Sequence, residues 1–385
     1  MHSHSDLDLP DSLPRWLNVV VAGIGLATLA GMLILWPRGE VDDRLQQGVT
    51  VEYVDGTVAS VERDTCDGIS APTGCQVAVT EITSGPTAGE SVRVLVLDTE
   101  EAAPQLNPGD TVVLLFNDGA IDQFRYTFVD FQRAAPLALL VGLFVIVVVA
   151  FGRWQGVRAL LGLAVSLGVI MAFVLPALTR ASSPIAVAVV GASFIAFAAL
   201  YLAHGVTTTT TVALLGTLGA LALITALATA FVSLASITGL VDDSTQTLNV
   251  TAVGVDLPGL VIAGTVLGAL GVLDDVTITQ VSTVAEVSRA NPQLPRRQLY
   301  RRAVRVGRDH VASTVNTLVL AYAGASLALL LVFSQGRVPA GRFVTSELIA
   351  TEIIRTTVGS IGLILAVPAT TALAAIVTTK PSAQT

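Results

Sequence analysis

Charged side chains are scarce in this chain. Only 13% of its 385 residues are charged, whereas 52% are apolar. A water-soluble protein carries about twice that share of charge. The apolar residues also form runs of about 20, the length of helix that crosses a hydrocarbon core about 30 Å thick. The scarcity of charge therefore excludes an ordinary soluble protein. It predicts an α-helical polytopic protein whose main partner is the lipid bilayer.

Cysteine is nearly absent as well. The two cysteines, Cys66 and Cys75, lie close together in a loop-like stretch without a nearby histidine. Two thiols alone do not make a structural zinc site, which takes four ligands. In an oxidising compartment the pair would form a disulfide, and otherwise both would remain free thiols. The sequence favours the disulfide and predicts neither a metal nor a cofactor.

The few charges are unevenly distributed. Residues 40–133 contain 17 Asp and Glu but 5 Lys and Arg, a net charge of −12. Because the whole chain has a net charge of −8, the rest of it carries +4. This split indicates one acidic aqueous domain and a membrane part with basic loops.

Residues 49–130 alternate between apolar and polar side chains, as strands do. Turn signals at Asp55-Gly56, at Gly85-Pro86 and at 107–110 separate the runs. Five or six short strands predict a small OB-like or open β-barrel. This domain would either bind a ligand or protein partner or simply be a solvated domain packed on the helices. The candidate strands, in one-letter code, are VTVEYV, TVASVE, QVAVTEI, SVRVLVL, TVVLLF and FRYTFV.

Eight apolar runs are long enough to cross a bilayer. The first has Trp16 and Trp36 at its ends and no cleavage site after it, which predicts an uncleaved anchor. The spans are expected at 17–36, 135–151, 157–178, 184–203, 212–237, 258–287, 311–333 and 356–378. The predicted organisation is a disordered tail at 1–15, an anchor at 16–37, an extracytoplasmic β-domain at 40–133, a seven-helix membrane domain at 134–379 and a tail at 380–385.

Arginines in short loops predict the orientation. The loop 289–308 contains seven Arg and no acid, and such a loop is retained in the cytoplasm. Counting helices from this loop places both chain ends in the cytoplasm and puts the β-domain and the acidic loop 241–256 outside. Arg38 and the acidic N-terminal tail disagree locally with this orientation. We expect a multi-pass protein of a bacterial cell (inner) membrane that binds no nucleic acid.

The sixth span contains two adjacent carboxylates, Asp274 and Asp275, in an otherwise apolar helix. If Arg289 marks the cytoplasmic edge, Asp275 lies about 21 Å deeper, near the middle of the bilayer. Two acids in hydrocarbon cost about 2.5–3.5 kcal/mol each, so they must face protein or water. Adjacent desolvated carboxylates tend to retain a proton, which is the chemistry of a proton or cation relay. The alternative is a structural pair that is hydrogen-bonded to neighbouring helices.

A polar stripe continues from these acids toward the cytoplasm. Asp275, Thr279, Ser282 and Glu286 are spaced four, three and four residues apart, which places them on one helical face. We therefore predict a relay made of Asp274, Asp275 and Glu286. The supporting polar residues are predicted to be Thr277, Thr279, Ser282, Ser313, Asn316 and Thr317.

Other polar residues in the spans have two interpretations each. In the seventh span, Ser313, Asn316 and Thr317 are the expected partners of the acids, beside His310, Thr314 and Tyr322. Glu352 and Arg355 are three residues apart and are expected to pair with each other. His204, at the cytoplasmic end of a helix, is either a ligand or an interfacial polar residue.

The sequence resembles the YibE/F family of bacterial membrane proteins. The matching stretches are GVLDDVTITQVSTVAE at 271–286, STVNTLVLAYAGASL at 313–327 and TTVGSIGLILAVPATTAL at 356–373. This resemblance implies a membrane topology more than an activity.

A weaker resemblance concerns mechanism. GVLDD followed by Glu286 is similar to the proton-relay helix of resistance-nodulation-division exporters and of the SecDF secretion motor. Those proteins also have a large external domain between their first two helices. Their acidic helix is the fourth span, whereas the acids here are on the sixth. Their relay also uses a lysine, and no relay lysine is present here. The resemblance implies a proton role for Asp274 and Asp275.

Two functions remain open from the sequence. One is a proton- or cation-coupled transporter or energy transducer that acts on an unknown small solute or ion. The other is a non-transporting adaptor whose helices anchor the β-domain. An ATP-driven pump is disfavoured because no phosphate-binding loop is present. An intramembrane aspartyl protease is disfavoured because both acids lie on one helix, and we expect no enzyme activity.

Overall fold

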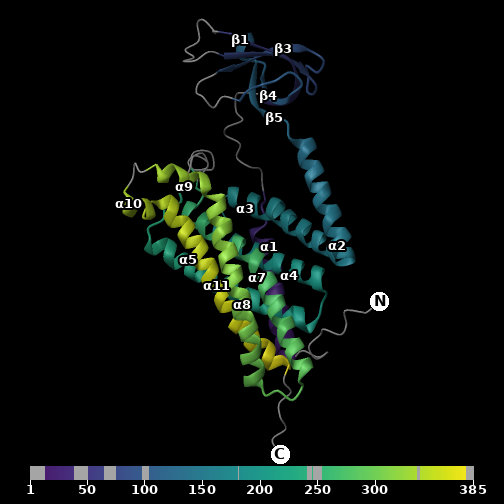
Figure 1. The fold of residues 1–385 in the computed structure, drawn as a ribbon, viewed down its shortest axis with the longest axis vertical. Helices are drawn as coiled ribbons and strands as arrows, with labels where there is room; N and C mark the ends of the chain where they lie inside the picture. Colours follow the sequence, from purple (N-terminus) through teal and green to yellow (C-terminus); the bar gives the residue numbers. More distant parts are fainter. Residues whose placement is uncertain are drawn as a thin grey trace, which may run out of the picture. The chain divides into compact units, whose positions relative to one another are not determined.

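The structure is a computed structural model that describes residues 14–38, 51–64, 75–97, 104–180, 182–240, 245, 254–335 and 339–378. The chain divides into a barrel unit, Asp42–Ala150, and a helical unit, Met1–Val41 with Phe151–Thr385 (Figure 1). Apart from Pro14 and Arg15, the tails predicted at 1–15 and 380–385 lie outside the described residues. So does most of the predicted acidic loop 241–256.

Five strands form a closed barrel in the order β1-β2-β3-β5-β4. All neighbouring strands are antiparallel except β3 and β5. The interior is filled by a cluster of aliphatic side chains and Tyr126. The alternating pattern predicts a small OB-like or open barrel of five or six strands, and the small barrel is confirmed, with five strands and in closed form. The strands are β1 (Val51–Asp64), β2 (Cys75–Ile82), β3 (Ser91–Leu97), β4 (Thr111–Asn117) and β5 (Tyr126–Phe131).

The turn predicted at Asp55-Gly56 is wrong, because both residues lie inside β1. The strands predicted on either side of it are one strand of 14 residues. Gly56 serves close packing: a Cβ atom there would lie 2.6 Å from Cγ2 of Thr80 on β2. Glycine in a strand interior can therefore mark a close approach of two strands as well as a turn. The turns predicted at Gly85-Pro86 and at 107–110 are present.

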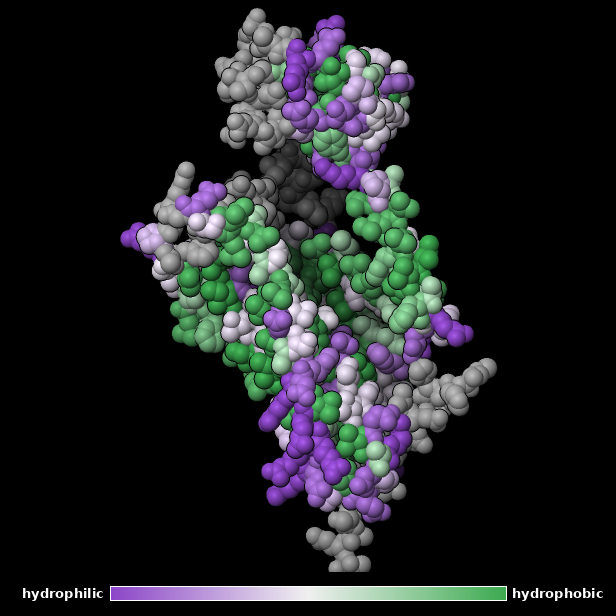
Figure 2. Space-filling model, viewed as in Figure 1, coloured by the Kyte–Doolittle hydropathy of each residue, from purple (hydrophilic) through white to green (hydrophobic). Residues whose placement is uncertain are grey.

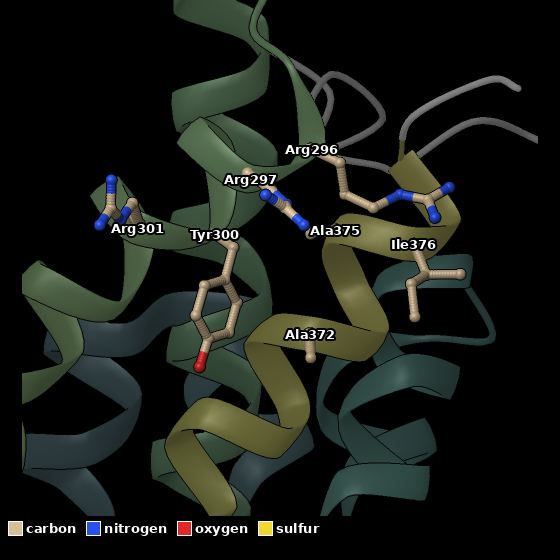
Figure 3. A pocket seen from close by; sticks show the side chains of 7 residues that line it. All are labelled: Arg296, Arg297, Tyr300, Arg301, Ala372, Ala375 and Ile376. Atoms are coloured by element: carbon tan, nitrogen blue, oxygen red, sulfur yellow. The ribbon is translucent and has the colours of Figure 1, made fainter. Parts of the chain in front are cut away.

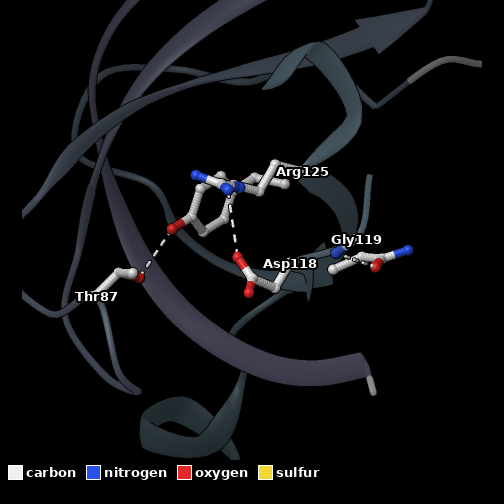
Figure 4. A network of polar contacts seen from close by, with 6 residues as sticks. Thr87, Asp118, Gly119 and Arg125 are labelled. Atoms are coloured by element: carbon white, nitrogen blue, oxygen red, sulfur yellow. Dashed lines mark hydrogen bonds and ion pairs between the residues drawn. The ribbon is translucent and has the colours of Figure 1, made fainter. Parts of the chain in front are cut away.

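Polar contacts join the turns of the barrel to its strands (Figure 4). The Tyr126 hydroxyl donates to Oγ1 of Thr87 at 2.8 Å, and Arg125 pairs with Asp118 at 3.2 Å. At the end of β5, hydrogen bonds from Arg133 and from the Phe131 amide lower the pKa of Asp130. These ion pairs are exposed, so each adds little to stability.

The predicted disulfide has one member among the described residues. Cys75 begins β2, where its side chain is buried and is not a free thiol. Cys66 lies outside the described residues. The bridge between Cys66 and Cys75 therefore stays a prediction.

A long helical run follows the barrel. It consists of α2 (Ala134–Val169), the π-helical turn η3 (Ile170–Val174) and α3 (Leu175–Thr179), 46 residues in all. At 1.5 Å per residue this run would be about 69 Å long, more than twice a hydrocarbon core. Its backbone leaves the helical region at Arg153, with φ 50° and ψ −130°. This break lies between the two spans predicted at 135–151 and 157–178.

The helical unit is built around α7, which contacts α4, α5, α8 and α11. Asp256 caps α7 by accepting a hydrogen bond from the Gly259 amide at 3.0 Å. Close packing also joins α5 to α11, since a Cβ atom at Gly216 would overlap Thr370. The helices are α1 (Arg15–Leu35), α4 (Pro184–His204), α5 (Thr208–Leu234), α7 (Leu257–Ala290), α8 (Arg296–Ala325), α9 (Leu327–Ser334), α10 (Ala340–Val344) and α11 (Glu347–Thr378).

Six of the described helices are long and apolar enough to cross a membrane: α1, the run from Ala134 to Thr179, α4, α5, α7 and α11. The seventh predicted span, 311–333, is not among them. It divides between α8, which ends at Ala325, and α9, which begins at Leu327.

The loop predicted at 289–308 is largely helical. α7 continues to Ala290 and α8 already begins at Arg296, so only the short segment 291–295 is a turn. Arginine, leucine and glutamine are good helix formers, and Pro295 precedes the first turn of α8. A run of arginines indicates which side of a membrane a segment occupies, but it does not indicate a loop.

Candidate functional site

Both predicted aspartates line one cavity of about 360 Å³ in the helical unit. Its walls come from the second half of α2, from the last turns of α4 and from the middle of α7. The polar side chains in it are Asp274, Asp275, His204 and Ser166, and the remaining lining residues are small or aliphatic. The structure thus brings the two acids of α7 together with a histidine of α4.

Asp274 is held on the buried side of the cavity. Its Oδ1 atom is fully buried and has no hydrogen-bond partner among the described residues. Thr217 of α5 interacts with the same carboxyl group. The Thr217 hydroxyl also lies 2.8 Å from the hydroxyl of Thr277, one turn farther along α7. A buried carboxyl oxygen without a partner is costly, so it calls for a functional explanation.

Asp275 is the exposed member of the pair. It faces His204, which interacts electrostatically with both Arg158 and Asp275. Arg158 also lies close to the chain after His204, with Nη2 3.8 Å from a Cβ atom built at Gly205. The titratable groups around the cavity are therefore two carboxyl groups, one guanidinium group and one imidazole ring.

The contacts between α4 and α7 show which part of α4 lies beside the two acids of α7. The two helices begin together, since a Cβ atom at Gly259 would lie 3.1 Å from Pro184. They run parallel, and His204, the last residue of α4, reaches the cavity beside Asp275. The 21 residues of α4 span about 32 Å, close to the thickness of a hydrocarbon core. The acids therefore lie level with the end of α4 and not with its middle.

The rest of the predicted stripe does not line this cavity. Thr279 and Glu286 are exposed, and Ser282 is half-buried. Glu286 pairs with Arg289, one turn farther along the same helix, at 3.0 Å. The polar residues of α7 that are buried near the acids are Thr277 and Gln280, and Asp274 is half-buried.

The partners predicted on the seventh span are also elsewhere. Ser313, Asn316 and Thr317 are exposed on α8 and do not line the cavity that holds the acids. The Thr317 hydroxyl donates to the carbonyl of Ser313 in its own helix. By contrast, the predicted pairing of Glu352 with Arg355 is confirmed, at 2.7 Å.

Several residues of the site were not singled out by the sequence. Arg158 and Ser166 come from α2, and Thr217 comes from α5. Gln280 is buried and donates to the Ala303 carbonyl of α8 at 3.1 Å and to the Thr371 hydroxyl of α11 at 2.7 Å. The spacing of Gln280 from Asp274 and Thr277, three residues at each step, was the available signal, because it marks one helical face.

Nothing in the cavity has the ligand set of a metal centre. Among the described residues, no group of three or more His, Cys, Asp or Glu side chains could hold a metal ion. The chemistry that the cavity supports is exchange of a proton, or transient pairing of a small cation with a carboxylate.

The family of the chain follows from comparison with known sequences. The sequence model of the YibE/F-like protein family matches residues 140–380, more than half of the chain. The match includes the cavity and every helix from α4 to α11. No curated protein and no solved structure matches the chain. The chain belongs to the YibE/F-like protein family.

Proposed function

We propose that this protein is a proton- or cation-coupled membrane transporter or energy transducer, and that Asp274 and Asp275 carry the proton or cation. The observation that supports this most directly is the unpartnered Oδ1 atom of Asp274 beside a cavity. Binding a proton or cation would satisfy that oxygen. Most buried polar groups with a structural role have a hydrogen-bond partner.

The proposed path uses the two acids in sequence. Asp275 is exposed and exchanges with water, while Asp274, whose Oδ1 atom is buried, holds the proton or cation within the helical unit. His204 and Arg158 adjoin Asp275, so they modulate its charge. Glu286, which is exposed at the far end of α7, is the proposed last exchange point with bulk water.

The proposed topology has eight spans: α1, the two sections of α2 on either side of Arg153, α4, α5, α7, α8 with α9, and α11. Both chain ends and the arginines of α8 are cytoplasmic, in a bacterial cell membrane, because seven arginines resist translocation. The barrel is then extracytoplasmic, where it is available to a protein partner. The transported species is an unidentified small solute or ion.

Proton movement can be tested without knowing the substrate. The purified chain is reconstituted in liposomes that contain a trapped pH-sensitive dye, and a potassium diffusion potential drives protons inward. We expect faster internal acidification with the wild type than with Asp274→Asn or Asp275→Asn. Asparagine keeps the shape of the side chain but cannot carry a proton.

The matched control is Asp309→Asn, because Asp309 is an exposed acid on α8 that does not line the cavity. It should behave like the wild type. If both cavity variants acidify the liposomes as fast as the wild type, the relay proposal is wrong.

The second candidate is a non-transporting adaptor, and a specific observation favours it. The neighbouring polar groups of α7, Thr277 and Gln280, bond to other helices. If the acids had the same structural role, Asp274→Asn would be tolerated but Asp274→Ala would lower the amount of protein in the membrane. Scoring abundance separately from proton flux distinguishes the two functions.

A further inference from the structure

A second cavity, of about 560 Å³, lies between the first turns of α8 and the last turns of α11 (Figure 3). Three arginines and a tyrosine come from α8, and small or aliphatic residues come from α11. Figure 3 shows Arg297 reaching toward α11 and the ring of Tyr300 lying beside Ala372. The cavity therefore has a cationic side and an apolar side. Its lining residues are Arg296, Arg297, Tyr300, Arg301, Ala372, Ala375 and Ile376.

An apolar groove of about 430 Å³ continues from this cavity along the same two helices. Tyr300 lines both spaces, so they lie next to each other. The groove runs past Arg308 to Val315 on α8, and Ile364 forms part of its α11 side. Apart from Tyr300 and Arg308, all of its lining residues are aliphatic or proline.

The charged residues that line the two spaces are all basic within the part of the chain that the structure describes. They are four arginines, and no described acid lines either space. Figure 2 shows hydrophilic surface gathered at the end of the helical unit where α7 and α8 meet, and hydrophobic surface farther along the helices. An occupant that complements this site has an anionic head and an apolar tail.

The site is long enough to hold a lipid of one membrane leaflet. From Arg297 to Val315 is 18 residues, or about 27 Å along a helix. One leaflet with its headgroups is about 20 Å thick. Gln280 joins α8 to α7 at Ala303, within about two turns of the acids along α7. The groove is therefore level with the last part of α4, although it is formed by α8 and α11, and the cavity lies farther along α8 toward its first turn.

We propose that the groove between α8 and α11 binds one anionic phospholipid of the membrane. Its phosphate lies between Arg297 and Arg301, and an acyl chain lies along Val304, Val311 and Val315. Clusters of arginine at a membrane surface attract anionic lipids, and the apolar groove selects a lipid over a soluble phosphate compound. The bound lipid fixes α8 against α11 and therefore supports α7, which contacts both helices.

Thermal unfolding in a nonionic detergent tests this proposal. The probe is dioleoylphosphatidylglycerol, and dioleoylphosphatidylcholine and inorganic phosphate are compared at the same concentrations. We expect phosphatidylglycerol alone to raise the unfolding temperature of the wild type. Each arginine near a membrane surface contributes about fivefold in affinity, so Arg297→Ala with Arg301→Ala should weaken the lipid response about 25-fold.

The matched control is Arg302→Ala with Arg305→Ala, which removes the same charge from α8. Neither residue lines the cavity or the groove, so this variant should respond like the wild type. If the Arg297/Arg301 variant does not fold, Arg297→Gln alone should still weaken the response about fivefold. Equal responses of the two double variants would overturn the proposal, and so would equal stabilisation by phosphatidylcholine or by inorganic phosphate.

Discussion

At the scale of single residues, the feature that matters most is the environment of Asp274. Burying an acid without a full set of hydrogen bonds destabilises a protein, and Asp274 Oδ1 is such a case among the described residues. Asp275, its neighbour, is exposed and close to His204. Two identical side chains in adjacent positions thus have different environments, which allows them different roles.

Asp274→Leu should not lower the stability of the protein. Leucine has nearly the shape of aspartate and needs no hydrogen bond, so we expect stability to be unchanged or higher by about 1 kcal/mol. The measurement is thermal unfolding of the purified protein in detergent. Asp309→Leu on the exposed face of α8 should stay within about 0.5 kcal/mol of the wild type. A loss of more than 1 kcal/mol at Asp274 would show that its carboxyl group is structural.

Gly216→Ala should destabilise the helical unit. A Cβ atom at this position would overlap the Thr370 side chain, which is buried between α5 and α11. Overpacking of this kind costs about 1–3 kcal/mol. The control is Gly219→Ala on the same helix, where no atom lies within 4 Å of the added Cβ. Thermal unfolding should separate the two variants, and equal midpoints would contradict the close packing.

The residues of the site were only partly predictable. Hydropathy and helical spacing predicted that Asp274 and Asp275 face a protected space, because the cost of lipid exposure is a property of the side chain itself. Their neighbours could not be predicted in the same way. A helical wheel shows which face of α7 a residue occupies, but not which helix packs there, so Ser313, Asn316 and Thr317 were expected where His204, Ser166 and Thr217 are found.

At the scale of elements, the length of α7 sets the level of the site. Its 34 residues extend for about 50 Å, longer than α4 by about 20 Å. The sequence interpretation counted the depth of Asp275 from Arg289, whereas the structure gives its level relative to α4. Only the contact of Gly259 with Pro184 shows where α7 begins relative to α4.

Gln280 should be essential for holding the extended part of α7. Its amide donates to Ala303 of α8 and to Thr371 of α11, so one side chain joins three helices. Gln280→Ala removes both hydrogen bonds in a buried setting, and we expect a loss of about 2–3 kcal/mol. Gln298→Ala, an exposed glutamine on α8, is the control for thermal unfolding. Identical unfolding of both variants would mean that these helices are held by apolar packing alone.

At the scale of the whole molecule, the chain consists of a barrel unit and a helical unit, and the family match at 140–380 falls mainly on the second. The acidic composition predicted a separate aqueous domain, and the alternating pattern predicted its barrel. The pattern alone did not show that the two strands predicted on either side of Gly56 are one strand, β1. A glycine at this position is compatible both with a turn and with a close contact between strands.

The proposed topology predicts that the turn after α7 and the barrel lie on opposite sides of the membrane. A cysteine introduced at Asn291 should react with a membrane-impermeant maleimide only in inside-out vesicles. A cysteine at Asp118, whose side chain is 79% exposed in the barrel, should react only in intact cells. Reaction of both positions from the same side would rule out the eight-span topology.

The pairing of β1 with β4 has a consequence for how the protein is made. Val51 pairs with Asn117, so the barrel cannot close until the chain between them has been synthesised. At typical rates of synthesis this takes roughly 3 to 13 s, during which the edges of the first strands have no final partner. The net charge of −12 over residues 40–133 gives nascent chains a mutual repulsion during this interval. We therefore expect the acidity of this segment to disfavour aggregation before the barrel folds.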